Sequence, residues 1–180
     1  MEKSDLGRRS ISEYRGERGA GDGGETSSAQ DDVTNVPKEL AMPLSDSPIF
    51  PSLPAQDIER AKAWYKDKLG FTPARDLGPG GQLYMSGSTL FILYQTPFAG
   101  TAKNTLAGWV VPDIDKAMAE LRAKGVKFED YAMGDQGPNT ENGVARDENS
   151  GAAAWFTDSE GNILNLAELP PGMDLNNPAG

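Results

Sequence analysis

The sequence of 180 residues contains no histidine and no cysteine. The first absence excludes catalytic pairs in which a histidine activates a serine or a cysteine. The second excludes thiolate nucleophiles, disulfide bonds and zinc sites built on cysteine. Any metal ion would have to be held by oxygen ligands alone, which favours weakly held Mg²⁺ or Ca²⁺ over Zn²⁺ or Fe²⁺. We therefore expect no tightly bound transition metal and predict no cofactor.

Basic residues are also few, since 17 Lys and Arg stand against 27 Asp and Glu and give a formal charge of −10. Without a cluster of cationic side chains to neutralise phosphates, nucleic acid is not an expected partner. No stretch reaches the roughly 18–20 apolar residues that span a bilayer, and the N-terminal sequence lacks the apolar centre of a secretory signal. Without such a span or signal we expect no membrane partner and a cytoplasmic location, and the absence of cysteine fits a reducing compartment.

The sequence divides into a tail, a domain and a short C-terminus. Residues 1–41 hold six Gly, nine acids and six bases without apolar periodicity, which predicts a disordered tail. Met42 directly precedes the first strand-like run, so two hypotheses remain open. Either Met42 is the natural initiator and the preceding residues are non-native or a mis-called start, or the tail is native and regulatory. Residues 43–169 are predicted to form one domain, followed by a mobile terminus over 170–180.

The domain contains an internal repeat. Residues 54–71, PAQDIERAKAWYKDKLGF, resemble residues 110–128, VVPDIDKAMAELRAKGVKF, at an offset of 56 positions. In each copy an Asp, Asp57 or Asp113, is placed to cap a helix whose apolar residues follow at helical spacing. A glycine, Gly70 or Gly125, then stands where a left-handed turn would end that helix. The pattern predicts two copies of one module, over residues 48–95 and 105–168.

Strand-like stretches surround each predicted helix. One precedes it, near residues 49–55 and 106–111, and three follow it, separated by turn-forming residues. The three are expected near 71–76, 82–86 and 89–95 in the first copy, and near 126–133, 152–157 and 163–168 in the second. The predicted fold class is therefore α+β, with two tandem βαβββ modules that form a curved eight-stranded mixed sheet and two helices on its outer face.

Three pieces of sequence carry a family resemblance. They are the duplicated Asp-Ile-x-x-Ala helix start, the helix end AWYKDKLGF and the terminal hairpin WFTDSEGNILNL. With these pieces, over about residues 48–168, the chain resembles the vicinal oxygen chelate superfamily of glyoxalases, extradiol dioxygenases and bleomycin-resistance proteins. The resemblance implies the glyoxalase/bleomycin-resistance fold. It does not select one function, because this fold supports many chemistries.

Metal-dependent members of this superfamily are similar in placing a His or Gln early in the first strand of each module and carboxylates on the last strands. The corresponding positions here are Phe50, Leu106, Asn165 and one residue within 92–94, Ile-Leu-Tyr. None of them supplies a charged or imidazole ligand, and one amide carbonyl does not offset the desolvation of a divalent ion. The resemblance therefore implies a metal-free, largely apolar cavity, as in the binding branches of the family.

Eight residues are predicted to bind a ligand. Phe50 and Leu106 would face the interior of the curved sheet, and the amide of Asn165 stands in an otherwise apolar stretch and needs a partner. For each position the alternative is a structural role, as core, as a dimer contact or as a satisfied amide. Four aromatic side chains are stacking surfaces for a planar ligand: Tyr84, Tyr94, Trp109 and Trp155.

The eighth predicted ligand-binding residue, Arg146, lies in the polar segment Gly134–Asn149, which joins two predicted strands. This segment is either a solvated loop or a flexible lid over a site. Arg146 is its only cation. The residue would anchor an anionic ligand or pair with Asp147 or Glu148.

Together these features predict a metal-free small-molecule-binding protein that sequesters an apolar or aromatic ligand in the concave sheet cavity, as bleomycin-resistance proteins do. The resemblance implies a homodimer, and the net negative charge would assist capture of a cationic compound. Enzymes remain the alternative. One is a metal-independent lyase or isomerase with a carboxylate or tyrosine base. Another is an enzyme similar to a glyoxalase or a dioxygenase that binds its metal ion through residues other than the four positions named above.

Overall fold

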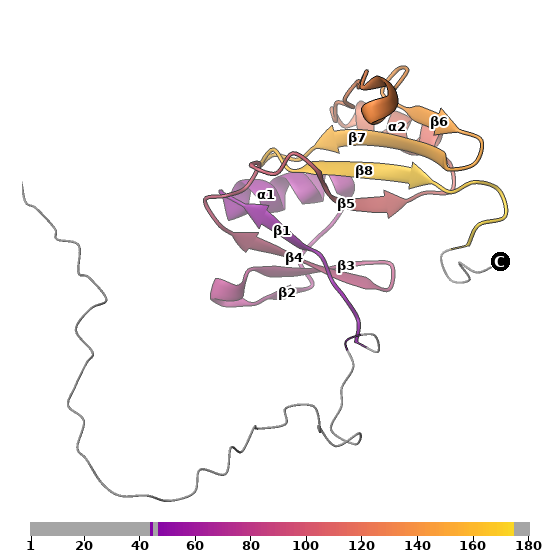
Figure 1. Ribbon diagram of the computed structural model, residues 1–180. Coiled ribbons are helices and arrows are strands. Elements are labelled where there is room, and N and C mark those ends of the chain that lie inside the picture. The colour runs from indigo at the N-terminus through magenta and orange to yellow at the C-terminus, as the bar shows by residue number, and fades with distance from the viewer. Residues whose placement is uncertain (1–43, 45–46, 175–180) are drawn as a thin grey trace, which may run out of the picture. The chain divides into compact units, whose positions relative to one another are not determined.

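The computed structural model describes residue 44 and residues 47–174, all within one compact unit, Leu44–Gly180. The predicted tail over 1–41, the position of Met42 and the end of the predicted C-terminal segment lie outside the described residues. The domain begins with the first module and ends with the second (Figure 1).

The first module follows the predicted order of elements. Strand β1 (Ser52–Ala55) leads into helix α1 (Ile58–Trp64), whose first turn is capped by Asp57 through a 3.0 Å bond from the Arg60 N–H to Oδ1. A π-helical turn η3 (Tyr65–Leu69) extends the helix to Gly70, where a φ of 78° ends it. The remaining elements are β2 (Arg75–Asp76), the short helix η4 (Gly78–Gly80), β3 (Gln82–Ser86) and β4 (Thr89–Gln95).

The second module repeats this order. Strand β5 (Thr105–Val110) leads into α2 (Ile114–Ala123), and Asp113 caps the helix by accepting the Lys116 N–H at 2.9 Å. The predicted caps are thus present in both copies. The later elements are the short helix η5 (Gly134–Gln136), β6 (Ala145–Asp147), β7 (Gly151–Thr157) and β8 (Ile163–Glu168).

The eight strands form two mixed four-stranded sheets, and no strand ladder joins these sheets within the described residues. Sheet 1 has the order β1-β4-β3-β2 and sheet 2 the order β5-β8-β7-β6. In each sheet the first strand runs parallel to the last strand of the module, and the other pairs are antiparallel. The α+β class and the tandem βαβββ modules are confirmed, with the eight strands divided between two sheets.

The predicted strands at 82–86, 89–95 and 163–168 have the observed bounds, whereas the second strand of each module differs. In the second module the predicted strand at 126–133 makes only isolated bridges, such as Phe128 with Phe156. The edge strand is instead β6, inside the segment expected to be a loop. The Asp147 carboxylate accepts the N–H groups of Asn149 and Ser150 at 2.9 Å, which makes the tight turn that folds β6 onto β7.

One hydrophobic core fills the space between the inner faces of the two sheets. Helix α1 and η3 lie between these faces (Figure 1). Trp64 stacks on Phe156 of sheet 2 with ring centroids 6.3 Å apart, and the adjacent Tyr65 lies 6.1 Å from Phe91 of sheet 1. Because the inner faces of both sheets contact one helix, the other faces, here called the open faces, point away from each other. No helix in the described part of the chain is long and apolar enough to cross a membrane.

The turn between β7 and β8 joins the second module to the first. Its Glu160 accepts the N–H groups of Gln56 and Asp57 at 2.9 and 3.0 Å and binds Arg60 through both carboxylate oxygens. Asp158 of the same turn accepts the buried Tyr65 hydroxyl at 3.0 Å. We call these contacts the Glu160 latch.

Candidate functional site

The strand register defines the open face of sheet 1. Its middle row crosses all four strands, because Arg75 pairs with Leu83, Leu83 with Ile92 and Ile92 with Ser52. Residues directly opposite in register have neighbouring side chains on one face. The alternating residues on the inner side, such as Leu53 and Phe91, are buried. The register places on the open face Ser52, Pro54, Arg75, Leu83, Met85, Leu90, Ile92 and Tyr94. Phe50, two residues before β1, is assigned to the same face by continuing the alternation of that strand.

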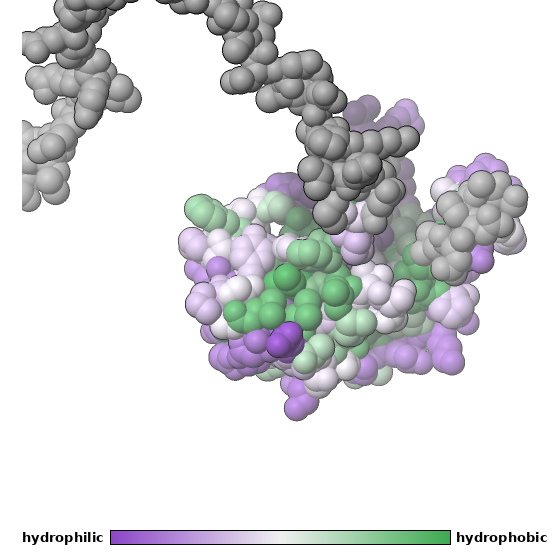
Figure 2. All heavy atoms as spheres, turned by 90° about the horizontal axis from the view of Figure 1, so that it is seen from below, coloured by the Kyte–Doolittle hydropathy of each residue, from purple (hydrophilic) through white to green (hydrophobic). Residues whose placement is uncertain are grey.

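Apolar side chains on this open face remain exposed. Phe50 and Met85 are 48% and 47% exposed, and Leu90 and Tyr94 are 39% and 37% exposed. Figure 2 views the molecule from the side of sheet 1 and shows apolar side chains gathered in the middle of that face, with polar side chains at the rim. A contiguous apolar patch of this kind is typical of a ligand site or of an interface between proteins.

The open face of sheet 2 has a different character. Its middle row is Trp155, Asn165 and Gly108, and the next row consists of Ala145, Ala153, Ala167 and Val110. The indole N–H of Trp155 donates to the Thr105 hydroxyl at 3.1 Å, and Tyr131 meets the indole edge to face at 5.7 Å. The side chains beside this fixed aromatic pair are therefore small.

Asn165 lies at the centre of that row and its amide has no hydrogen-bond partner among the described residues. The side chain lies over Gly108, where an added Cβ would overlap Asn165 Oδ1. Glycine at position 108 therefore provides the space in which the amide rests. The amide nitrogen and oxygen therefore have free hydrogen-bonding capacity.

Three residues predicted to bind ligand lie on the inner side instead. Tyr84 is fully buried, and burial raises the pKa of its hydroxyl, which has no partner among the described residues, to about 12. Trp109 stacks on Phe71 at 5.8 Å and donates its indole N–H to Ser86, and Leu106 packs against the core beside a bulge in β5. The chain thus separates the eight predicted residues, and only Phe50, Tyr94, Trp155 and Asn165 are on open faces.

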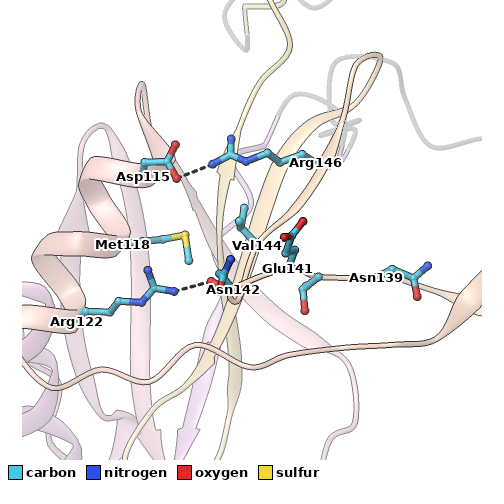
Figure 3. Close-up of a pocket in the computed structure, with 9 residues that line it drawn as sticks. Asp115, Met118, Arg122, Asn139, Glu141, Asn142, Val144 and Arg146 are labelled. Carbon is cyan, nitrogen blue, oxygen red and sulfur yellow. Dashed lines mark hydrogen bonds and ion pairs between the residues drawn. The ribbon is translucent and has the colours of Figure 1, made fainter.

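Arg146 lies on the inner side of β6 and lines a cavity of about 530 Å³ between α2 and the 139–146 segment (Figure 3). It pairs with Asp115 of α2 at 2.5 Å rather than with Asp147 or Glu148. At the other end of the cavity Arg122 donates to the Asn142 carbonyl at 2.6 Å, as the figure shows. These contacts tie the predicted lid to α2, on the side of the sheet away from the open face.

Two carboxylates with a shifted pKa, Asp158 and Glu160, belong to the Glu160 latch. Hydrogen bonds from the Gly78 N–H and the Ser150 side chain lower the pKa of Asp76 and Asp147 in their turns. Burial alone would raise the pKa of Glu160, but its hydrogen bonds with Arg60, with the Asp57 and Gln56 N–H groups and with Ser159 lower it below the ordinary value. Burial raises the pKa of Asp158, although hydrogen bonds from Asn162 and Tyr65 oppose the shift. Both carboxylates are engaged in hydrogen bonds that join the two modules.

The residues present do not fit the metal ion that metal-dependent relatives hold. Phe50 and Asn165 lie on the open faces of different sheets, and Leu106 faces the core. Within residues 44 and 47–174, no three acidic side chains gather closely enough to share an ion. A lone amide between apolar groups does not replace the hydration shell of a divalent cation.

Apolar or charged residues on the open face of sheet 1 that the sequence did not predict as ligand-binding are Arg75, Leu83, Met85, Leu90 and Ile92. Four of them are found by the period of two along β3 and β4, read outward from the buried Tyr84 and Phe91. Arg75 is found only with the register, because a two-residue strand has no periodicity of its own.

Comparisons with known proteins agree with this architecture. The family model described as Glyoxalase/Bleomycin resistance protein/Dioxygenase superfamily matches residues 49–166. No protein of curated function matches the chain.

Several solved structures have a similar fold. Lactoylglutathione lyase from Agrobacterium tumefaciens is similar with a TM-score of 0.51 and 18% identity, over 68% of this chain and 93% of that one. The fosfomycin resistance protein FosX from Listeria monocytogenes has a TM-score of 0.51 and 13% identity, over 67% and 89%. These two similarities show the fold alone. TnmS3, an antibiotic binding protein from Streptomyces sp. CB03234, has a TM-score of 0.49 and 24% identity, over 67% and 93%.

Proposed function

Because the chain belongs to the Glyoxalase/Bleomycin resistance protein/Dioxygenase superfamily, we propose that it binds a small apolar or aromatic molecule on its open sheet faces, in a cavity that a second copy of the chain completes. The protein acts by holding this molecule. Its ligand-binding residues are Phe50, Tyr94, Trp155 and Asn165, together with Leu83, Met85, Leu90 and Ile92.

The observation that carries this proposal is the exposed apolar open face of sheet 1. This face consists mainly of apolar residues. Four of its side chains are each more than a third exposed: Phe50, Met85, Leu90 and Tyr94. Burying such side chains against a guest releases about 25 cal/mol for every Å² removed from water. The face therefore offers affinity through shape and stacking, without a charged inorganic centre.

A second copy is part of the proposal because one chain does not bring its two open faces together. The faces point away from each other across the shared core, as the contacts of Trp64 and Tyr65 with opposite sheets indicate. A homodimer related by two-fold symmetry would place the open face of sheet 2, with Trp155, Asn165 and small side chains, over the apolar face of sheet 1. Such a pairing forms two equal cavities.

The test uses the full chain and the uncharged fluorescent probe phenylnaphthylamine. We expect saturable binding, a raised melting temperature with probe and a dimer in sedimentation. Leu90→Asp should weaken binding at least about tenfold because it places a charge in the apolar face. Met173→Asp, at a residue 52% exposed beyond the last strand, is the matched control and should bind as the wild type does.

Two results would contradict the proposal. One is a folded wild type that neither binds the probe nor is stabilised by any amphipathic or aromatic compound. The other is a stoichiometric metal ion in protein purified without chelator, which would favour the enzymatic alternative.

A further inference from the structure

The open face of sheet 1 carries a single charged side chain among the residues that the register places there. Arg75, on the edge strand β2, begins the row that continues through Leu83 and Ile92. Every other position that the described register assigns to this face is apolar or a neutral hydroxyl. One guanidinium therefore stands at the rim of an apolar surface.

Arg75 differs from the other arginines of the described chain in having no partner. Arg60 binds Glu160, and Arg146 binds Asp115. Arg122 donates to the Asn142 carbonyl and lies 5.3 Å over the Phe128 ring. The guanidinium of Arg75 makes no hydrogen bond and no ion pair with any described residue, and its side chain is exposed. Its five N–H donors are free to bind a guest.

A guest lying along the middle row would rest on Leu83 and Ile92 and reach Arg75 at one end. Neighbouring side chains in such a row are about 5 Å apart, so a molecule with two fused rings spans the two apolar positions. A guanidinium forms paired hydrogen bonds with the oxygens of a carboxylate or sulfonate. The row therefore combines an apolar floor with an anion-binding end.

We propose that the guest of this face is an amphipathic acid, an aromatic or aliphatic molecule whose anionic group binds Arg75. This inference rests on the proposed function and refines it. It also reverses the expectation from net charge, which favoured a cationic compound, because the charge beside the apolar floor is positive although the whole chain carries −10. At cellular salt, distant surface charges are screened and the contacting charge decides selectivity.

The test compares two probes with the same ring system, anilinonaphthalene sulfonate and uncharged phenylnaphthylamine. Wild type should bind the sulfonate more tightly. Arg75→Gln should weaken sulfonate binding about tenfold, the loss expected for one charge-assisted contact, and change phenylnaphthylamine binding less than about twofold. Arg75→Lys should lie between the two. Lys116→Gln removes the same charge from the exposed surface of α2 and should change neither affinity.

Each other outcome contradicts the inference in its own way. Equal loss of both probes in Arg75→Gln would give Arg75 a structural role, and no loss of either would leave it outside the site. If Arg75→Gln dissociates the dimer in sedimentation without selective loss of the sulfonate, Arg75 binds the second copy instead. If wild type binds the uncharged probe but not the sulfonate, the inference fails while the proposed function stands. Binding of neither probe contradicts both.

Discussion

The two modules are alike on their inner sides and different on their open sides. Each places an Asp at the start of its helix, a glycine at its end and aliphatic residues on the inner faces of its strands. On the open side, sheet 1 presents Phe50, Met85 and Leu90, whereas sheet 2 presents alanines beside Trp155. The repeat is therefore retained where the fold requires it, and it has diverged where a guest or another chain would make contact.

The largest losses of stability are expected from substitutions of buried residues on the inner faces of the sheets. Leu93→Ala and Leu164→Ala each remove a fully buried side chain, and each should lower the free energy of unfolding by about 2–5 kcal/mol. Leu90→Ala, on the same strand as Leu93 but on the open face, should cost less than about 1 kcal/mol. Urea denaturation of the three variants measures the contrast. Equal losses at positions 90 and 93 would show that the open face is covered in solution by something that packs as tightly as the core.

The second prediction concerns how the helix starts are held. The N–H groups of Gln56 and Asp57, directly before α1, bind Glu160 of the other module. The Ile114 N–H of α2 instead binds Glu168 of its own module at 2.7 Å. Glu160→Gln should cost about 2 kcal/mol because it weakens the Arg60 pair and two backbone bonds together. Glu168→Gln should cost about 1 kcal/mol.

The two variants should also differ in cooperativity. If Glu160 links the modules, Glu160→Gln should lower the steepness of the denaturant transition, and Glu168→Gln should not. If the two substitutions change the steepness of the transition equally, Glu160 caps the helix without coupling the two modules.

A third prediction concerns how the stabilisation by the Glu160 carboxylate depends on pH. Glu160 has a lower pKa in the folded chain than in the unfolded one, since its bonds with Arg60 and with backbone N–H groups outweigh the effect of burial. Between these two pKa values the unfolded state binds more protons, so the stabilisation is present above the unfolded value and is lost as the pH falls through the folded value. The difference in unfolding free energy between wild type and Glu160→Gln should therefore be constant near neutral pH and shrink in acid. A difference that does not change with pH would contradict the assignment.

Much of the fold could be predicted from the sequence, because its signals are local. Asp57 and Asp113 have the side chain that a helix start needs, Gly70 and Gly125 tolerate the left-handed turn, and turn-forming residues separate β3 from β4 and β7 from β8. The edge strand β6 was not predicted because its three residues adopt the strand conformation through pairing with β7. Their own strand propensity does not indicate it.

The site was harder to predict for a related reason. Whether Trp109 and Tyr84 face the core or the open side depends on a bulge in β5 and on register, and neither leaves a pattern in the residues themselves. Arg146 could be placed beside Asp115 only once α2 and β6 were known to be neighbours, because 31 positions separate the pair along the chain. The predicted and observed positions therefore differ at residues whose surroundings come from distant parts of the chain.

The smallest expected effect on stability sharpens the contrast between the open faces. In Gly108→Ala the new methyl group overlaps Asn165 Oδ1, but that atom is the end of a side chain with no other partner in the described chain, so it can turn away. We expect a change below about 1 kcal/mol in unfolding free energy, measured in urea. The displaced amide should still alter the guest site, and probe binding should change several-fold. Gly80→Ala adds the same methyl group in η4, where its nearest neighbour is Leu77 Cβ at 3.4 Å, and should leave probe binding unaltered. If Gly108→Ala instead destabilises the chain as much as Leu93→Ala does, Asn165 is held rigidly and its amide serves the fold rather than the guest.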